Sequence, residues 1–230
     1  MKKLLLLLLL SLGLISLVYA DAENFSFKTS NIVINVKTPS GFFESSYIDP
    51  EIEELVKMLY PRELFNFHSV LVPKDFYEKN DRYIILVTLT ELNDTNISKG
   101  DFKDLKDTLR DEQLTLMNEI LDDANEIIDN SVSDINSNWG TDLKLSINET
   151  TPLGVFIDSN KAISISTIMA GNFSASGVEE NLLVLNSTTF IHIKNRLIIA
   201  YVYSNFNSST DIIWLEAKTK ELVELMLKAN

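Results

Sequence analysis

The part of this sequence that most constrains the fold is its second half, where short segments of alternating apolar and polar residues follow one another through tight turns. Alternation with a period of two predicts half-buried strands. Strands joined by tight turns must run antiparallel, because a parallel connection needs a crossover of a dozen or more residues. We therefore predict an antiparallel sheet built from the segments 143–147, 154–157, 161–169, 182–193 and 197–203.

The connections between these strands carry turn residues. Asp158, Ser159 and Asn160 form a turn signal, and residues 194–196 have the spacing of a hairpin connection. The glycines and serines of 171–177 predict a flexible loop.

The first half of the chain mixes further strands with a short helix. Strands are predicted at 31–37, 64–72 and 82–92. In the second of them we expect Phe65, Phe67 and Leu71 to share one face. A short helix is predicted at 50–59, with Pro50 in its first turn.

Two amphipathic helices are predicted to cover the sheet. Apolar residues recur at spacings of three and four over 101–130, and acidic residues occupy the opposite face. A final helix is predicted at 211–229 with Thr210 as its N-cap. The fold class predicted is α+β, with a largely antiparallel sheet of about six to eight strands covered by a long central helix and a C-terminal helix.

The first twenty residues predict export. Lys2 and Lys3 precede an apolar run over 4–18, and the small residues Val18 and Ala20 mark a cleavage site. That run of about 15 residues is shorter than the roughly 20 that a spanning helix needs, although an uncleaved membrane anchor is the alternative. We expect a cleaved secretory signal peptide at 1–20, a single α+β domain at 21–230 and no stable membrane anchor after cleavage.

Cysteine usage bears on the compartment, because extracellular eukaryotic domains usually carry disulfides. The chain contains no cysteine, which favours a bacterial protein of the periplasm or exterior. A glycosylated eukaryotic protein is the alternative, since Asn-X-Ser/Thr sequons occur at Asn24, Asn93, Asn96, Asn148, Asn172, Asn186 and Asn207.

The net charge limits the partners of the chain. It is −13 for the whole sequence and −15 once Lys2 and Lys3 leave with the signal peptide. A charge of this sign opposes binding to nucleic acid and to anionic membrane surfaces. We therefore expect no nucleic-acid partner.

The residues that usually carry catalysis are few. The two histidines, His68 and His192, each lie within a predicted strand, without a second histidine or a carboxylate at ligand spacing. We interpret both as histidines on the less buried face of a sheet, and zinc would need three or four nitrogen or sulfur ligands. The sequence contains no G-x-S-x-G, P-loop or G-x-G-x-x-G motif. No catalytic, cofactor-binding or metal-binding residue is assigned, and no cofactor is expected.

Carboxylates could still hold calcium. Asp104, Asp107 and Asp111 lie on one face of the predicted long helix, where the simpler interpretation is a solvated face. Residues 134–140 begin like a calcium loop, but Trp139 replaces the required glycine and Leu145 the final glutamate, so we interpret them as a turn that ends the helix.

Aromatic residues gather near the C-terminus, at Tyr201, Tyr203, Phe206 and Trp214. They could line a shallow apolar or sugar-binding patch. The favoured interpretation is that they pack the closing helix onto the sheet, because aromatic side chains dominate core burial.

The tail also carries a resemblance. It combines a predicted hairpin, the pattern Tyr-x-Tyr at Tyr201 and Tyr203, and the pattern Asp-x-x-Trp at Asp211 and Trp214. On these residues, 189–230 resemble the ending of a family of uncharacterised exported bacterial proteins. The order of elements is similar to the PsbP-like fold, an antiparallel sheet covered by helices. Members of that fold are mostly binding or assembly factors, so the resemblance implies binding rather than catalysis.

Together these observations predict an exported soluble protein that acts as a non-enzymatic binding or assembly factor of the cell envelope. Its partner would be another envelope protein, met through the sheet face or the aromatic C-terminal corner. Two alternatives stay open. One is a hydrolase that uses two carboxylates on a glycan or similar polymer, and the other is a low-affinity calcium-binding envelope protein.

Overall fold

The computed structural model describes residues 24–76, 82–111 and 113–230, with the side chains of 113–123 left out. The predicted signal peptide at 1–20 lies outside the described residues. Among the helices within these ranges, none is long and apolar enough to cross a membrane.

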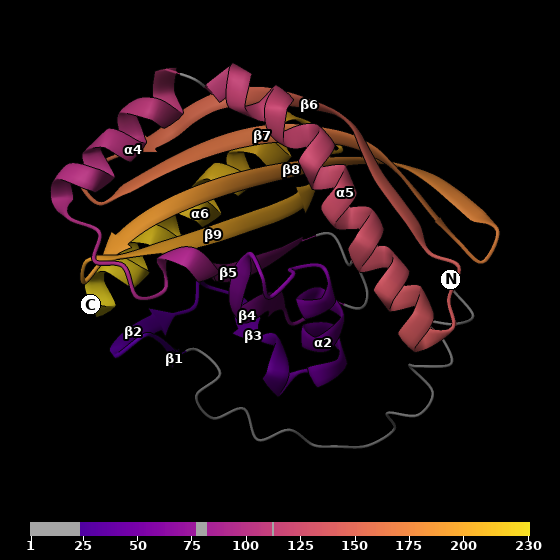
Figure 1. Cartoon of the computed structure of the whole chain (residues 1–230), viewed down its shortest axis with the longest axis horizontal. Coiled ribbons are helices and arrows are strands. Elements are labelled where there is room, and N and C mark those ends of the chain that lie inside the picture. The colour runs from indigo at the N-terminus through magenta and orange to yellow at the C-terminus, as the bar shows by residue number, and fades with distance from the viewer. Residues whose placement is uncertain (1–23, 77–81, 112) are drawn as a thin grey trace.

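The described chain contains nine strands and four α-helices (Figure 1). The helices are α2 (Pro50–Met58), α4 (Lys99–Asp111), α5 (Gln113–Trp139) and α6 (Ser209–Ala229). The strands are β1 (Asn24–Thr29), β2 (Ile32–Lys37), β3 (Phe42–Glu44), β4 (Phe65–Pro73), β5 (Arg82–Leu89), β6 (Lys144–Asp158), β7 (Ala162–Ala175), β8 (Val178–Ile193) and β9 (Arg196–Asn205).

Seven strands form one antiparallel sheet in the order β3-β4-β5-β9-β8-β7-β6. Strands β1 and β2 form a separate antiparallel pair. The predicted α+β class with a largely antiparallel sheet is confirmed. The pairing of β5 with β9 joins strands more than a hundred residues apart in the sequence.

Helices cover both faces of the large sheet. In Figure 1, α6 lies behind the sheet, and α2, α4 and α5 lie in front of it. The pair β1–β2 lies on the same face as α6, since Ile34 and Val36 of β2 join the cluster that contains Leu222.

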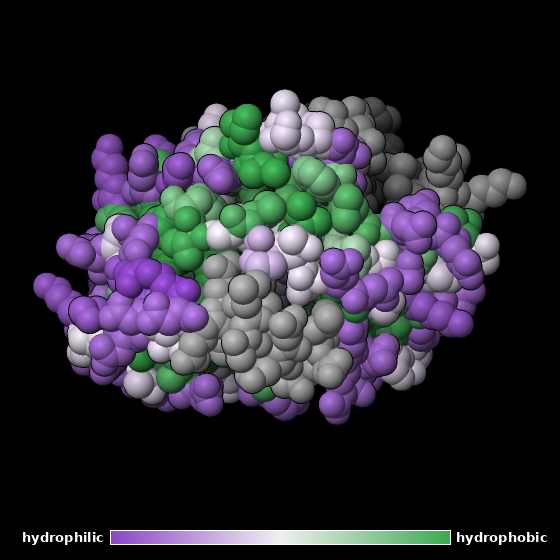
Figure 2. Space-filling model, turned by 90° about the horizontal axis from the view of Figure 1, so that it is seen from above, coloured by the Kyte–Doolittle hydropathy of each residue, from purple (hydrophilic) through white to green (hydrophobic). Residues whose placement is uncertain are grey.

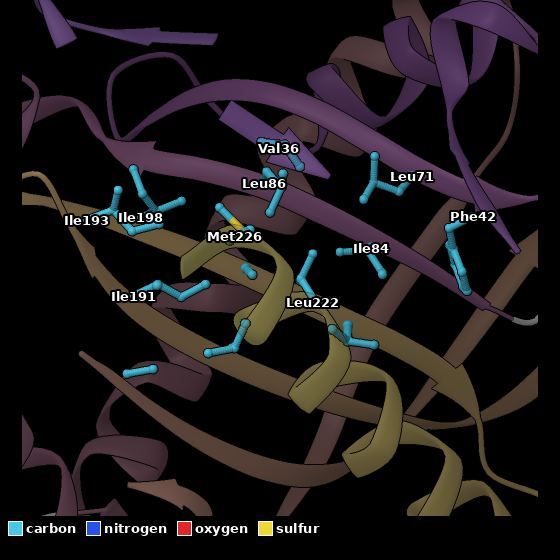
Figure 3. Close-up of a cluster of buried hydrophobic side chains, with 14 of the residues drawn as sticks. Val36, Phe42, Leu71, Ile84, Leu86, Ile191, Ile193, Ile198, Leu222 and Met226 are labelled. Atoms are coloured by element: carbon cyan, nitrogen blue, oxygen red, sulfur yellow. The ribbon is translucent and has the colours of Figure 1, made fainter. Parts of the chain in front are cut away.

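The core under α6 is the largest apolar cluster (Figure 3). Leu215, Leu222 and Met226 are spaced by seven and four residues, so they lie on one helix face, and each is fully buried. They face Ile191 and Ile198 of the sheet.

Three hydroxyl side chains meet between β7 and β8 in this core. The hydroxyl oxygen of Ser164 lies 2.8 Å from those of both Ser187 and Thr189, and all three residues are fully buried. Their hydrogen bonds to one another satisfy polar groups that burial would otherwise leave costly.

Two hairpins close through two-residue turns. Lys194 and Asn195, between β8 and β9, both have positive φ, at 49° and 60°. Ser176 and Gly177, between β7 and β8, have φ of 53° and 76°. Two consecutive positive φ values match the twist of the flanking strands. The prediction of a flexible loop at 171–177 is therefore wrong, because β7 continues to Ala175 and the turn occupies two residues.

The segments 143–147 and 154–157, predicted as separate strands, belong to the single strand β6. Three irregularities in its register against β7 let it bend without ending. The backbones approach closely here, since a Cβ on Gly171 would lie 2.3 Å from the carbonyl oxygen of Ser146.

The predicted helix 101–130 is two helices, α4 and α5, and α5 runs on to Trp139. Residues 134–139 are therefore helical rather than a turn. Burial of Val132 and Ile135 keeps this segment on the sheet, and the helix ends before Gly140, whose φ is positive.

Two local predictions on faces and caps are also wrong. A bulge between Phe67 and Ser69 reverses the alternation of β4, so Leu71 faces the α6 side while Phe65 and Phe67 face α2. The N-cap of α6 is Ser208 rather than Thr210. The Asp211 carboxylate accepts hydrogen bonds from the backbone N–H groups of Asn207 and Ser208, which holds this end of the helix.

Candidate binding groove beside helix α5

A hollow in the described part of the molecule lies between α5 and the ends of β6, β7 and β8 that extend beyond β9. It is a groove of about 710 Å³, within the range of ligand-binding pockets. Strands β6, β7 and β8 form it because they continue past β9, whose pairing with β8 stops at Val184 and Asn205.

Strand register places the floor of the groove. Leu145 pairs with Phe173, and Phe173 pairs with Glu180, so the three residues lie side by side on one face of the strands. Val132 and Asp129 of α5 form the wall. Leu145 and Phe173 are half-buried and Val132 is buried, which gives the groove an apolar base beneath polar rims.

The charge of the lining is mainly negative. Asp129, Glu179 and Glu180 contribute three carboxylates, all exposed, against the single ammonium of Lys144. The remaining lining is polar and uncharged, from Ser146, Asn172, Ser174 and Asn181. The three carboxylates are exposed, unlike the buried carboxylic acid that donates a proton in glycoside hydrolysis. The arrangement is suited to binding positively charged and hydrogen-bonding groups.

Two asparagines fix α5 to the rim of the groove. Asn125 exchanges two hydrogen bonds with the backbone of Ile147, at 2.8 and 2.9 Å. Asn136 exchanges two with the backbone of Leu143, both at 2.8 Å. Asp129 and Val132 lie between them on the same helix face, so these contacts hold the wall of the groove in place.

A second, smaller hollow of about 160 Å³ lies at the start of α6. The guanidinium of Arg82 lies 4.3 Å from the ring centroid of Trp214 and 3.4 Å from the carboxylate of Asp211. Lys218 lies over Phe42 and forms an ion pair with Glu221 at 2.6 Å. Because both cations already have carboxylate partners, this corner offers little free charge to a ligand.

The C-terminal aromatic residues do not gather into one patch. Phe206 and Trp214 pack on the α6 face, and Tyr201 and Tyr203 pack on the opposite face. The interpretation as core packing is the one consistent with these positions. The sequence places Tyr201 and Tyr203 two residues apart on β9, so they share a face that Trp214 cannot reach through the sheet.

Tyrosines instead form a cluster under α2. The hydroxyl of Tyr60 lies 3.2 Å from that of Tyr203, and the rings of Tyr83 and Tyr203 stack with centroids 4.7 Å apart. Burial raises the pKa of Tyr83 and of Tyr201 to about 12. These hydroxyls therefore stay protonated and serve the packing of α2 on the sheet.

The two histidines are packed within the fold. His192 is buried, its Nε2 lies 2.7 Å from the carbonyl oxygen of Ile97, and its ring stacks on Phe102. His68 stacks on Phe27 with ring centroids 3.9 Å apart, and burial lowers its pKa to about 4. The prediction of a less buried face is wrong for His192, which is buried against Phe102 of α4, whereas His68 is half-buried beside β1.

The acidic face of α4 carries its own counter-charges. Asp107 accepts from Lys103 at 2.7 Å and also from Arg110. In the part of the chain that the structure describes, no group of three or more His, Asp or Glu side chains could hold a metal ion.

Sequence reasoning missed the groove. The glycines and serines of 171–177 predict a loop at Phe173, and no motif in the sequence points to Asn125 or Asn136. One signal was present: the spacing 125, 129, 132 and 136 follows one helix face, and asparagine is unfavourable in a helix interior unless its amide has a partner.

Comparisons with known proteins add a distant likeness. No family model matches the chain, and no curated protein matches it. Among solved structures, the Ran-binding protein Mog1p of Saccharomyces cerevisiae is 12% identical over 91% of this chain and 95% of its own, with a TM-score of 0.33. A mutant of the protein Mog1 is 12% identical over 90% of this chain and 94% of its own, also with a TM-score of 0.33. Likeness at this level establishes nothing about function.

Proposed function

We propose that this chain is an exported, soluble, non-enzymatic binding or assembly factor of the bacterial cell envelope. The observation that carries the proposal is the groove beside α5, which has an apolar floor and an acidic rim. The charge and the predicted signal peptide support export and solubility, and the resemblance of the tail supports an envelope role.

The charge of the groove defines the partner. The lining of the groove includes three carboxylates and one lysine, and the whole chain carries a net charge of −13. Opposite charges steer association and set specificity. We therefore propose an envelope protein that presents a positively charged segment with an apolar side chain for the floor formed by Leu145 and Phe173.

The test uses the full chain with a C-terminal tag, expressed in a bacterium and recovered from the periplasm. An intact mass that begins at Asp21 is expected if the signal peptide is cleaved. Partners are then captured from an envelope extract and identified by mass spectrometry. A protein retained at low ionic strength and released at high salt is expected, because salt screens exposed charges.

A pair of charge-matched variants makes the test specific to the groove. The groove variant is Glu179→Lys with Glu180→Lys, and the control is Glu91→Lys with Glu224→Lys, both exposed residues outside the groove. Loss of the partner from the groove variant alone supports the proposal. Equal retention by both variants, or capture of nothing by a folded sample, contradicts it.

Neither alternative function has a structural observation in its favour, because the groove carboxylates are exposed and Asp107 is already paired with Lys103 and Arg110. Turnover of a glycan polymer by the purified chain would replace our proposal with the hydrolase. A rise in thermal stability with millimolar calcium would replace it with the calcium-binding protein.

A further inference from the structure

Among the residues that the structure describes, β6 is the last strand of the seven-stranded sheet, so one of its edges has no neighbouring strand. With 15 residues, it is a long edge strand. An exposed edge of this kind is a template for pairing with another chain, and proteins usually block it. In Figure 1, α5 lies alongside the first half of β6, in agreement with the contacts between the two elements.

Two side-chain amides of α5 occupy this edge in the way that a strand would. Asn125 donates from Nδ2 to the carbonyl oxygen of Ile147 and accepts from its N–H. Asn136 does the same at Leu143. Each amide thus supplies one donor and one acceptor to one residue, which is what a neighbouring antiparallel strand supplies to alternate residues.

The spacing along the two elements is compatible. Leu143 and Ile147 are four residues apart, about 13 Å along a strand. Asn125 and Asn136 are eleven residues apart, about 16 Å along a helix, and both lie on the face that carries Val132. Leu143 directly precedes β6 and Ile147 lies within it, so the two amides hold the backbone on either side of Leu145.

We infer that Asn125 and Asn136 stand in for a neighbouring strand and keep the β6 edge closed against a second copy of this chain. A second copy fits the edge because two antiparallel β6 strands can pair about a twofold axis, with the same residues on both sides. Such pairing would continue the sheet across both molecules. The inference does not require the proposed function, although Asn125 and Asn136 also hold the wall of the groove.

Apolar surface on the side of the molecule where β6 lies favours association with a second copy of this chain. Figure 2 views the chain from above, the side on which β6 lies in Figure 1, and apolar side chains form a continuous band there between hydrophilic ones. Leu153 of β6 is 40% exposed. Exposed apolar patches rimmed by polar residues commonly mark surfaces that associate with another protein.

The test removes the amides and measures the mass of the protein in solution. The variant is Asn125→Leu with Asn136→Leu, and the matched control is Asn138→Leu, an exposed position on the same helix. Light scattering after size-exclusion chromatography is expected to show a monomer for the natural sequence and for the control. The double variant is expected to form dimers whose fraction rises with concentration.

A third change distinguishes strand pairing from non-specific association. Leu145→Pro removes a backbone N–H that would donate to a neighbouring strand. Proline is compatible with the unpaired edge of a sheet but not with an edge that pairs with another strand. Added to the double variant, it is expected to restore the monomer. A double variant that stays monomeric at high concentration, or dimers that survive Leu145→Pro, would overturn the inference.

Amide hydrogen exchange keeps the inference testable if the double variant does not fold. In the natural sequence, the N–H groups of Ile147 and Leu143 should be protected. Asn125→Leu alone should accelerate exchange at Ile147 and leave Leu143 protected. If the exchange rate of the Ile147 N–H were the same in Asn125→Leu as in the natural sequence, the role assigned to the Asn125 side chain would be contradicted.

Discussion

At the scale of single residues, Asp158 ties α4 to the end of β6. Its carboxylate accepts from Arg110 at 2.6 and 3.1 Å and from Lys106 at 2.7 Å, and these hydrogen bonds lower its pKa to about 2. Lys106 is buried, so its ammonium depends on this partner. Because the Asp158 side chain is itself 35% exposed, the interaction is weaker than a fully buried pair.

We predict that Asp158→Asn lowers the free energy of unfolding at pH 7 by about 1 kcal/mol, because Lys106 keeps its burial and loses its counter-charge. Asp107→Asn changes an exposed ion pair on α4 and should lower the free energy of unfolding by less than Asp158→Asn does. The lowered pKa stabilises the fold above the unfolded value of 3.8, and this stabilisation is lost as the pH falls towards 2. Urea unfolding of both variants measures the difference, and equal costs would refute the role of Lys106.

We predict that His68 makes the stability of the fold depend on pH, in a higher pH range than Asp158 does. Burial against Phe27 lowers its pKa from 6.5 to about 4, so the folded state favours the neutral ring. The unfolded state binds the proton first, and stability is therefore lost as the pH falls from 6.5 to 4. His68→Phe should keep the ring contact and remove this titration. Melting temperatures across the window should fall less for the variant than for the natural sequence, and parallel curves would contradict the assignment.

At the scale of elements, α6 is held by burial along one face. Leu222 is fully buried, whereas Ile213 on the same helix is 68% exposed. We predict that Leu222→Ala lowers the free energy of unfolding by about 2–5 kcal/mol, since it removes contacts and leaves a cavity. Ile213→Ala should change it by less than about 0.5 kcal/mol. Chemical denaturation of the two variants compares them, and similar costs would mean that α6 is not packed as described.

At the scale of the whole molecule, the sheet joins the cores of both faces. Ile198 and Ala200 of β9 belong to the α6 core, and Ile199 between them belongs to the α2 core. We therefore predict that both faces unfold in one transition. Circular dichroism and tryptophan fluorescence should give coincident curves, with Trp214 reporting on α6 and Trp139 on the end of α5. Separate midpoints would show that α5 leaves the sheet before the rest unfolds.

Patterns among neighbouring residues account for most of the local structure of this protein. The alternation of Ile32, Ile34 and Val36 follows from the period of a strand, and the spacing of Leu215, Leu222 and Met226 follows from the period of a helix. Tight turns near Asp158 and Asn195 require antiparallel neighbours. These features depend on residues close in the chain, and they are sufficient for the α+β class.

Which distant elements meet depends on long-range packing. It paired β5 with β9, placed Tyr203 and Trp214 on opposite faces, and reversed β4 at a bulge that no local pattern indicates. The groove and the contacts of Asn125 and Asn136 with β6 have the same origin. They depend on how helix α5 crosses the sheet, and that crossing is set by packing and by unpaired backbone groups rather than by neighbours in the sequence.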